Sequence, residues 1–370
     1  MAGYESATHI NTHHERLDML AGVEHDKQCL HDYQLLRSVG IRAARDGLRW
    51  HLIDRGAGDY DFSSFVPMLK AANETGIQVI WNVCHYGWPE DVDVFAAQFI
   101  DRLVAFAKAV AKVVREHSDE IPFYTPINEV SFLSWAATRR IIHPFAHGRD
   151  NELKRQLVRA TIACCEALWS VDKRARMVYP EPVVNVVAPP GRPDLAAEAA
   201  SYTEAQFEAW DMIAGRAEPS LGGAEHYLDV VGVNFYHSNQ WEHIGGRLRW
   251  EDEPRDERWL PFRYMLARVW QRYRKPTFVS ETSHFGVGRA RWITEIAQEV
   301  YQARSLGVPV EGICLYPILD RFDWENKNHW HNSGLWDLEA RDGILARVIN
   351  HPYYEALKQS QDLLASAGCV

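Results

Sequence analysis

The sequence predicts a (β/α)8 barrel that spans residues 1–370 as a single domain. Short runs rich in β-branched residues alternate with longer amphipathic stretches along the whole chain, which is typical of a parallel sheet covered by helices. Eight such units follow one another, and eight favour a closed barrel over an open doubly wound sheet, which is the alternative fold. No change of composition divides the chain, and barrels of this type often exceed about 250 residues as one domain.

The predicted strands share a short length and a high content of β-branched and apolar residues. In order along the chain they are 17–21, 41–45, 79–83, 123–128, 176–179, 230–234, 277–280 and 312–316. Residues 1–16 precede the first of these runs, and we expect them to form a flexible N-terminal segment.

Helices are expected between the strands, because apolar residues recur there at every third or fourth position. The stretch from Phe99 to Val113 shows this spacing most clearly. A later helix is expected over about 290–306, where Gly307 and Pro309 end it. The irregular segments 183–193 and 240–258 follow strand ends, so they are predicted to be long loops on the active face of the barrel.

Composition and charge restrict the possible partners. The chain is 46% hydrophobic and 24% charged, which is typical of a globular protein with a substantial core. Its net charge is −10 and its basic residues are dispersed, so no nucleic-acid partner is expected. Residues 1–16 lack the features of a signal peptide, and no apolar run approaches the roughly 18 residues that span a bilayer. We therefore expect no membrane partner and a cytoplasmic location, with secretion by an atypical route as the alternative.

Neither the cysteines nor the histidines predict a metal site or a cofactor. The six cysteines are scattered without a C-x-x-C motif and are interpreted as buried free thiols: Cys29, Cys84, Cys164, Cys165, Cys314 and Cys369. His329 and His331 look like a metal-binding pair, but no carboxylate or third histidine lies at ligand spacing nearby. No metal and no cofactor are therefore expected.

Polar residues follow the C-terminal ends of the predicted strands, where the active sites of (β/α)8 barrels lie. They are Arg45, His85, Asn128, Glu129, Glu181, Asn234, Tyr236, Glu281, Asp320 and Asp323. Glu129 and Glu281 follow the fourth and seventh strands, which lie on opposite sides of a barrel mouth. Cleavage of a glycosidic bond needs one protonated carboxyl and one ionised carboxylate. Arg45 close to Glu281 would keep that carboxylate ionised.

Several segments resemble motifs of glycoside hydrolase family 1, in the same order. Thr125–Val130 is similar to the family's acid/base motif, and Val279–Thr282 is similar to its nucleophile motif. The other matching segments are Arg45 with Trp50, His85–Pro89, Leu228–Tyr236, Tyr316–Trp324 and Ser333–Asp337. The resemblance extends from about Leu17 to Asp337 and implies a retaining β-glycosidase on a (β/α)8 barrel.

The resemblance also implies a role for each matched residue. Glu129 would be the general acid/base, and Glu281 would be the nucleophile that forms the glycosyl-enzyme. Asn128 would hold the sugar 2-hydroxyl, while Arg45 and Tyr236 would orient Glu281. The residues expected to contact substrate are His85, Tyr316, Asp323, Trp324, Asn234, Glu24, Glu181 and Trp88. The role of Glu181 is left open between a sugar contact and support of its neighbours.

Departures from the family pattern fall in the expected sugar pocket. Tyr86 and Tyr316 stand where the family has tryptophans, and Asp323 stands for a glutamate that grips two sugar hydroxyls. The family's sugar-binding glutamine is absent after the first predicted strand, where Glu24 follows instead. These changes leave the identity of the sugar open.

The sequence thus predicts a retaining exo-β-glycosidase that hydrolyses a small β-glycoside by double displacement. One alternative is a transglycosidase with the same carboxylate pair. Another is a barrel that binds carbohydrate without turnover, since a fold does not by itself imply an activity. The oligomeric state is left open.

Overall fold

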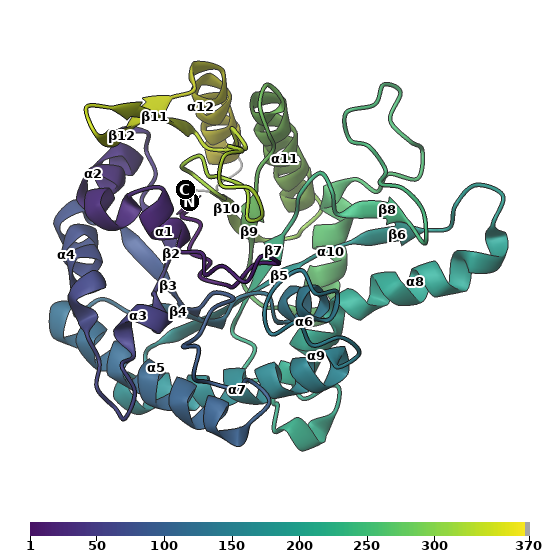
Figure 1. Cartoon of the computed structure of the whole chain (residues 1–370). Coiled ribbons are helices and arrows are strands. Elements are labelled where there is room, and N and C mark those ends of the chain that lie inside the picture. The colour runs from purple at the N-terminus through teal and green to yellow at the C-terminus, as the bar shows by residue number, and fades with distance from the viewer. Residues whose placement is uncertain (367–370) are drawn as a thin grey trace.

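The computed structural model describes residues 1–366 and contains a closed barrel of parallel strands (Figure 1), which confirms the predicted fold class. In order around the barrel the strands are β1 (Ala2–Gly3), β2 (Ala43–Gly47), β3 (Gln78–Cys84), β4 (Phe123–Ile127), β5 (Arg176–Pro182), β7 (Val230–Asn234), β9 (Thr277–Thr282) and β10 (Val310–Leu315). Each strand pairs in parallel with the next, and β10 pairs with β1 to close the ring. Seven of these eight strands overlap the predicted runs.

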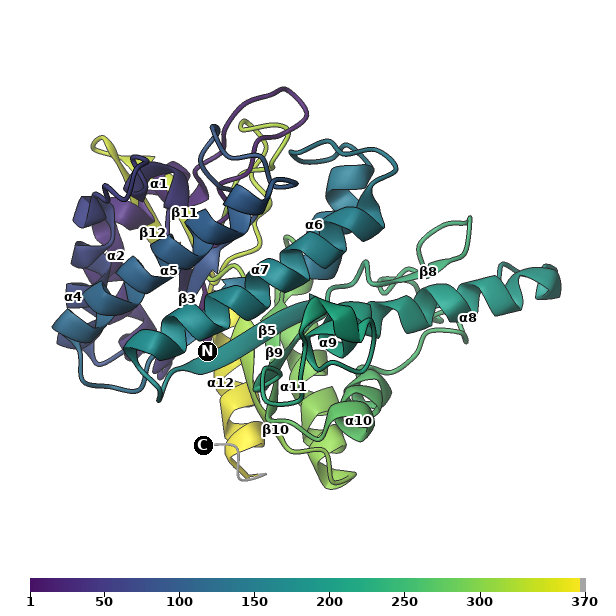
Figure 2. The same cartoon turned by 90° about the horizontal axis from the view of Figure 1, so that it is seen from below.

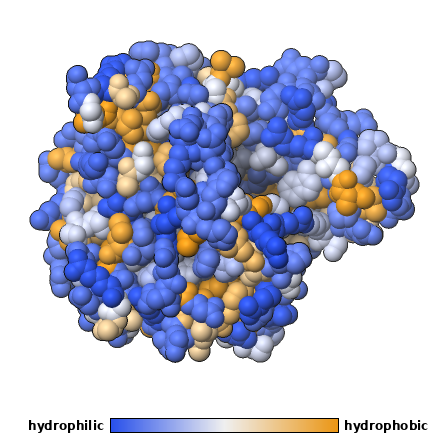
Figure 3. Space-filling model, in the orientation of Figure 1, coloured by the Kyte–Doolittle hydropathy of each residue, from blue (hydrophilic) through white to orange (hydrophobic). Residues whose placement is uncertain are grey.

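Helices surround the barrel on its outside (Figures 1 and 2). The longer ones are α2 (His25–Ser38), α4 (Val66–Thr75), α5 (Ala97–His117), α7 (Asp150–Val171), α10 (Phe262–Tyr273), α11 (Gly288–Ser305) and α12 (His351–Ser366). Within residues 1–366, no helix combines the length and the apolar character needed to cross a membrane. On the face drawn in Figure 3, hydrophilic residues predominate and smaller apolar areas are interspersed among them.

The predicted helices bury one face against the barrel, as their apolar spacing indicated. In α5, Phe99, Leu103, Phe106 and Val110 are all buried against the core. Helix α11 covers most of the predicted stretch 290–306 and ends just before Gly307, which adopts a positive φ of 83°. A positive φ costs glycine little, which is why glycine so often follows the last turn of a helix.

Shorter elements follow the barrel strands along the chain. They are α1 (Met19–Gly22), α3 (Trp50–Ile53), α6 (Val130–Thr138), α8 (Ala196–Glu204), α9 (Glu208–Ile213) and two small sheets, β6 (Asn185–Val187) with β8 (Gln240–Glu242) and β11 (Trp336–Arg341) with β12 (Ile344–Ile349). Helix α8 projects away from the barrel beside the first of these sheets (Figure 2). The irregular segments predicted at 183–193 and 240–258 therefore carry short strands as well as loops.

The prediction of the first strand was wrong. The run 17–21 enters helix α1 instead, because the Asp18 side chain accepts a hydrogen bond from Ala21 N at 3.1 Å and caps that helix. The first strand is β1, in which Ala2 pairs with Leu315 and with Ala44. Residues 2–9 are all buried, so the segment predicted to be a flexible tail completes the barrel.

Five of the six cysteines lie in the described part of the chain, and all five are buried free thiols, as predicted. Cys369 lies outside the described residues.

A buried charge network joins the β11–β12 hairpin to helix α2. Arg347 of β12 donates to both oxygens of Asp32 on α2, at 2.6 and 2.8 Å. His25 contacts Asp32 at 2.7 Å and Asp46 of β2 at 2.8 Å. Burial opposes the charge of His25, but the carboxylates of Asp46 and Asp32 outweigh it and raise the His25 pKa to about 9. The positive charges of His25 and Arg347 and the negative charge of Asp32 therefore stabilise one another.

Replacing Arg347 should destabilise the fold strongly. In Arg347→Met the carboxylate of Asp32 stays buried after losing its strongest donor, and breaking a buried ion pair from one side costs about 3–5 kcal/mol. Urea unfolding followed by circular dichroism measures this difference.

The matched control is Arg341→Met in the same hairpin. Arg341 is 58% exposed and pairs with Glu339 on the surface, so its loss should leave the free energy of unfolding nearly unchanged. Equal destabilisation by the two variants would contradict the importance of the buried network.

Candidate active site

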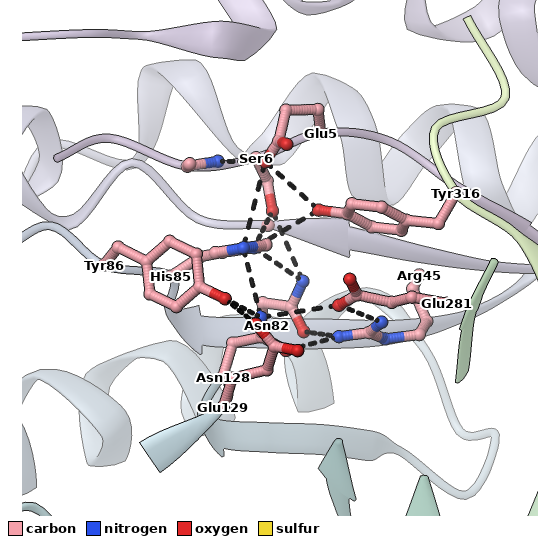
Figure 4. Close-up of polar contacts among 12 residues, drawn as sticks. Glu5, Ser6, Arg45, Asn82, His85, Tyr86, Asn128, Glu129, Glu281 and Tyr316 are labelled. Carbon is pink, nitrogen blue, oxygen red and sulfur yellow. Dashed lines mark hydrogen bonds and ion pairs between the residues drawn. The ribbon is translucent and has the colours of Figure 1, made fainter. Parts of the chain in front are cut away.

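Two glutamates lie at the C-terminal ends of facing strands and share one network of polar contacts (Figure 4). Glu129 follows β4 directly and forms the N-cap of α6, with a left-handed φ of 45°. Glu281 is the fifth residue of β9. Both side chains are buried, at 6% and 4% exposure. The structure thus brings together the carboxylate pair that the sequence predicted.

Three donors surround the carboxylate of Glu281. Arg45 Nη1 donates to Oε1 at 2.9 Å, and Tyr236 OH donates to Oε2 at 2.8 Å. The amide nitrogen of Asn128 lies 3.4 Å from Oε1. Hydrogen bonds to an ionised group are stronger than those between neutral groups, so these contacts stabilise a negative charge on Glu281. Such a carboxylate is suited to attack an electron-poor carbon.

Arg45 is fully buried in the barrel and holds several groups at once. Besides Glu281, it donates to the Ser280 carbonyl at 2.8 Å and to Asn128 Oδ1 at 2.7 Å. Burial opposes its charge, but Glu281 outweighs that effect and raises the pKa of Arg45. Arg45 therefore remains charged and fixes the side chain of Asn128 between the two glutamates.

Glu129 lies in a different environment. Its Oε1 accepts a hydrogen bond from Asn234 Nδ2 at 2.7 Å, and its Oε2 accepts one from Tyr86 OH. Burial, and then the negative charge of Glu281, raise its pKa well above the ordinary value, although the two hydrogen bonds oppose this shift. Burial and the charge of Glu281 both favour the protonated form of Glu129, which is the form that a proton donor needs.

His85 is the centre of the polar contacts on the β1 side of the site. Its Nδ1 lies 2.9 Å from Ser6 Oγ, and its Nε2 lies 3.2 Å from Asn128 Nδ2. Burial, followed by the charge of Arg45, lowers its pKa well below the usual range, so the ring is neutral. Tyr316 OH is 3.5 Å from the same ring. His85 and Tyr316 thus lie where the sequence predicted them, around the carboxylate pair.

Glu5 is a site residue that sequence reasoning missed. It follows β1, and its buried Oε1 lies 3.3 Å from Tyr316 OH and 3.8 Å from His85 Nε2 (Figure 4). Burial raises its pKa, while Arg321, whose Nε is 3.7 Å away, opposes that rise. The only signal in the sequence was a carboxylate placed just after a short apolar start, and the misplaced first strand obscured it.

Glu24 was predicted to contact substrate, but the structure places it elsewhere. Its carboxylate accepts a hydrogen bond from Leu345 N at 2.8 Å and another from Gln28 at 3.1 Å, so it joins α2 to the β11–β12 hairpin. The prediction failed because Glu24 follows a helix and not the first strand. Glu5 occupies the place that the prediction assigned to Glu24.

Trp88 was also predicted to contact substrate, and here too the structure differs. Its ring is 1% exposed and packs edge-on against Phe99 of helix α5, with centroids 5.5 Å apart. Because Phe99 belongs to an outer helix, Trp88 fills the layer between the barrel and that helix. Trp324, in contrast, packs on His9 and lies 6.0 Å from the ring of Tyr86.

Two predicted substrate contacts have carboxylates that are engaged by nearby groups. Glu181, at the end of β5, accepts two hydrogen bonds from Ser131 N at 3.1 and 3.2 Å, and burial raises its pKa to about 8. It supports the start of α6, directly after Glu129. Asp323 accepts backbone hydrogen bonds within its own turn, and His331 Nε2 lies 3.1 Å from its Oδ2. Asn234 Nδ2 donates to Glu129 Oε1 at 2.7 Å, and its contact with substrate stays a prediction.

A cavity of about 1060 Å³ adjoins helix α6, which begins directly after Glu129. Its walls include Ser131 and Phe132, which follow Glu129 on α6, and Ser238, which follows Tyr236. The aromatic part of its lining is supplied by Phe132, Trp135, Tyr202 and Trp241. Neither glutamate lines this cavity, so it is a space beside the carboxylate pair.

No protein family model matches the chain, and no curated protein sequence matches it. Solved structures do resemble it. A family 1 β-glucosidase from Thermotoga maritima is 12% identical, with a TM-score of 0.73 and coverage of 92% of this chain and 87% of that one. The β-glucosidase of that organism in complex with glucoimidazole is 13% identical, with a TM-score of 0.73 and coverage of 92% and 88%.

The AHE enzyme from Alicyclobacillus herbarius is similar to the same extent. It is 14% identical to this chain and has a TM-score of 0.71. The match covers 93% of this chain and 88% of the AHE enzyme. At such low identity these likenesses show a shared fold, which is the (β/α)8 barrel expected from the resemblance.

The pKa of Glu129 should respond in opposite directions to two substitutions. In Glu281→Gln it should fall, because a negative charge no longer opposes ionisation of Glu129. In Tyr86→Phe it should rise, because the ionised carboxylate loses a donor. Carbon-13 NMR titration of the glutamate carboxyl groups measures both shifts, and the spectrum of Glu129→Gln assigns the signal.

Tyr124→Phe is the control for this titration, since Tyr124 is a buried tyrosine on β4 that lies outside the network. It should leave the pKa of Glu129 unchanged. Shifts of the same sign in Glu281→Gln and Tyr86→Phe would contradict the described electrostatics.

Proposed function

We propose that this chain is a retaining exo-β-glycosidase that hydrolyses a small β-glycoside. One observation carries the proposal: two buried glutamates share a polar network but lie in opposite electrostatic environments. Glu281 is surrounded by donors that stabilise its charge, whereas the pKa of Glu129 is raised by burial and by Glu281. Acid/base assignments in glycosidases follow from this kind of contrast.

In the first step, the Glu281 carboxylate attacks the anomeric carbon while Glu129 donates its proton to the glycosidic oxygen. The bond between that carbon and oxygen breaks, the aglycone leaves as an alcohol, and a covalent glycosyl-enzyme forms. In the second step, ionised Glu129 removes a proton from water, whose oxygen displaces Glu281 from the anomeric carbon. Proton and charge are thereby restored to their starting places.

The surroundings of the pair support a division into two binding regions. Glu5, His85, Tyr316 and Trp324 lie on the β1 and β10 side, and Trp324 Nε1 is buried without a partner among the described residues. We assign this side to the sugar whose bond is cleaved. The aromatic cavity that begins next to Glu129 is assigned to the leaving group, because the acid must face the departing oxygen. Resemblance in fold to a β-glucosidase that binds glucoimidazole agrees with a small sugar as ligand.

Substitution of the two glutamates tests the proposal. Glu281→Gln should lower turnover of a nitrophenyl β-glycoside by about a thousandfold or more, because no nucleophile remains. Glu129→Ala should lower it by about a hundredfold or more for a substrate with a poor leaving group. Azide should restore activity in Glu129→Ala when the leaving group is good, and it should not restore Glu281→Gln. Initial rates with and without azide measure all of these effects.

Glu116→Gln on the exposed side of α5 is the control and should keep the original rate. Wild-type rates in both active-site variants would refute the assignment. Sugar binding by calorimetry without hydrolysis would favour a non-catalytic barrel, and transfer to an added sugar in preference to water would favour a transglycosidase. Proton NMR of the first product distinguishes retention from inversion at the anomeric carbon.

Glu5 should help to select the sugar. Glu5→Gln keeps the size of the side chain but removes its charge, so the relative kcat/KM values among aryl β-glycosides should change by about tenfold. A panel of glucoside, galactoside, fucoside, mannoside, xyloside and 6-phosphoglucoside measures the ranking. Glu24→Gln is the control, because Glu24 contacts the β11–β12 hairpin. An altered ranking in Glu24→Gln, with none in Glu5→Gln, would reverse the two roles.

A further inference from the structure

Three side chains from separate parts of the chain meet beside the candidate active site. His237 follows β7, His284 follows β9, and Glu251 belongs to the loop between β8 and α10. One ligand atom from each lies within 4.8 Å of the others. Among the described residues, this is the only group of three or more histidine, cysteine or acidic side chains whose ligand atoms lie this close together.

The cluster contains buried polar atoms without partners. His237 is 4% exposed, and its Nδ1 has no hydrogen-bond partner among the described residues. The Oε2 atom of Glu251 is also buried and unpartnered, although its Oε1 lies 3.3 Å from His284 Nε2. Buried polar atoms in native proteins nearly always have a partner, so each orphan requires an explanation. A cation bound between these residues supplies one for both atoms.

Aromatic rings enclose the cluster. The ring centroid of Trp250 lies 4.8 Å from that of His284, and Phe285 lies 5.0 Å from His237. Trp292 packs on both histidines and is itself held by a hydrogen bond to Thr282 at 2.8 Å. An apolar shell of this kind limits the access of water and fixes the histidine rings, both of which strengthen metal binding.

Two of the arginine side chains near the cluster form ion pairs with other glutamates. Arg255 and Arg291 stack on Trp250, but they pair with Glu295 and Glu253 at 2.7 Å each. Arg247 is exposed to solvent. The side chain of Glu251 is 32% exposed and leaves an approach to the cluster from solution.

We propose that His237, Glu251 and His284 bind a divalent transition-metal ion, with Zn²⁺ the best match. Two imidazole nitrogens and one carboxylate oxygen are borderline ligands that suit zinc, whereas calcium and magnesium require mostly oxygen ligands. Three protein ligands leave a fourth position for water.

The position of the cluster indicates a structural role. His237 directly follows Tyr236, which contacts Glu281, and His284 lies three residues after Glu281. Among the described residues, no hydrogen bond or ion pair joins His237, Glu251 or His284 to Glu129 or Glu281. A metal ion here fixes the loop that carries Glu251 to the ends of β7 and β9, at the rim of the candidate active site. The proposal does not depend on the proposed function.

Zinc binding to the whole chain tests the proposal. The protein is stripped with a chelator, titrated with ZnCl₂ by calorimetry, and dialysed for metal analysis. We expect one zinc ion per chain, a thermal midpoint that rises with Zn²⁺, and a visible Co²⁺ spectrum typical of tetrahedral coordination. His237→Ala and His284→Ala should each weaken zinc binding by at least about tenfold.

Two further variants keep the outcome decisive. Glu251→Gln alters a partly exposed side chain without changing its size, so it should fold and still weaken zinc binding. His329→Ala removes an exposed histidine and should leave zinc binding unchanged. Less than half an equivalent of zinc, an equivalent that survives in Glu251→Gln and His237→Ala, or an equal loss in His329→Ala would each overturn the proposal.

Discussion

The arrangement of the site depends on one buried guanidinium, that of Arg45. A charge inside a barrel is costly unless opposite charge and hydrogen-bond acceptors surround it. Glu281 supplies the charge, and the Ser280 carbonyl and Asn128 supply the acceptors. Each of these groups belongs to a different strand or strand end from Arg45. The electrostatic requirement of one side chain therefore fixes the relative positions of β2, β4 and β9.

The same requirement explains why the short N-terminal strand matters. Arg45 pairs with Gly3 in the barrel register, and the Arg45 guanidinium lies 5.4 Å from the ring of Tyr316. A Cβ atom at Gly3 would lie 2.0 Å from that ring, so only glycine allows Tyr316 its place. The short strand β1 therefore closes the barrel and also leaves the space in which Tyr316 packs next to the buried Arg45.

Most of the fold could be predicted because its strands are long enough to show a pattern. Seven strands and the main helices have such patterns, and Glu129 and Glu281 were found because each follows or ends a recognisable strand. Strand β1 has two residues, which is too short for any periodicity, so Glu5 was missed and Glu24 was chosen instead. Trp88 was misassigned because sequence does not show which face of a loop packs inward.

The contacts that sequence could not predict are those made by distant loops. His237, Glu251 and His284 are separated by 14 and 33 residues, and no local spacing links them. The candidate metal ligands that stand out in the sequence are the cysteines and the closely spaced pair His329 and His331. Tertiary structure determines ligand sets of this kind, because the loops that carry them are positioned by strands elsewhere in the barrel.

The two tyrosines that depart from the family pattern change the chemistry of the site as well as its shape. A tryptophan presents one N–H group at a fixed edge of the ring, whereas a phenol can donate to a carboxylate and accept from an amide. Tyr86 does both, since it contacts Glu129 and also lies 3.2 Å from Asn128 Nδ2. Tyr316 joins Glu5 to the ring of His85. The Tyr86 hydroxyl thus joins Glu129 to Asn128, and its hydrogen bond lowers the pKa of Glu129 against the larger effect of burial.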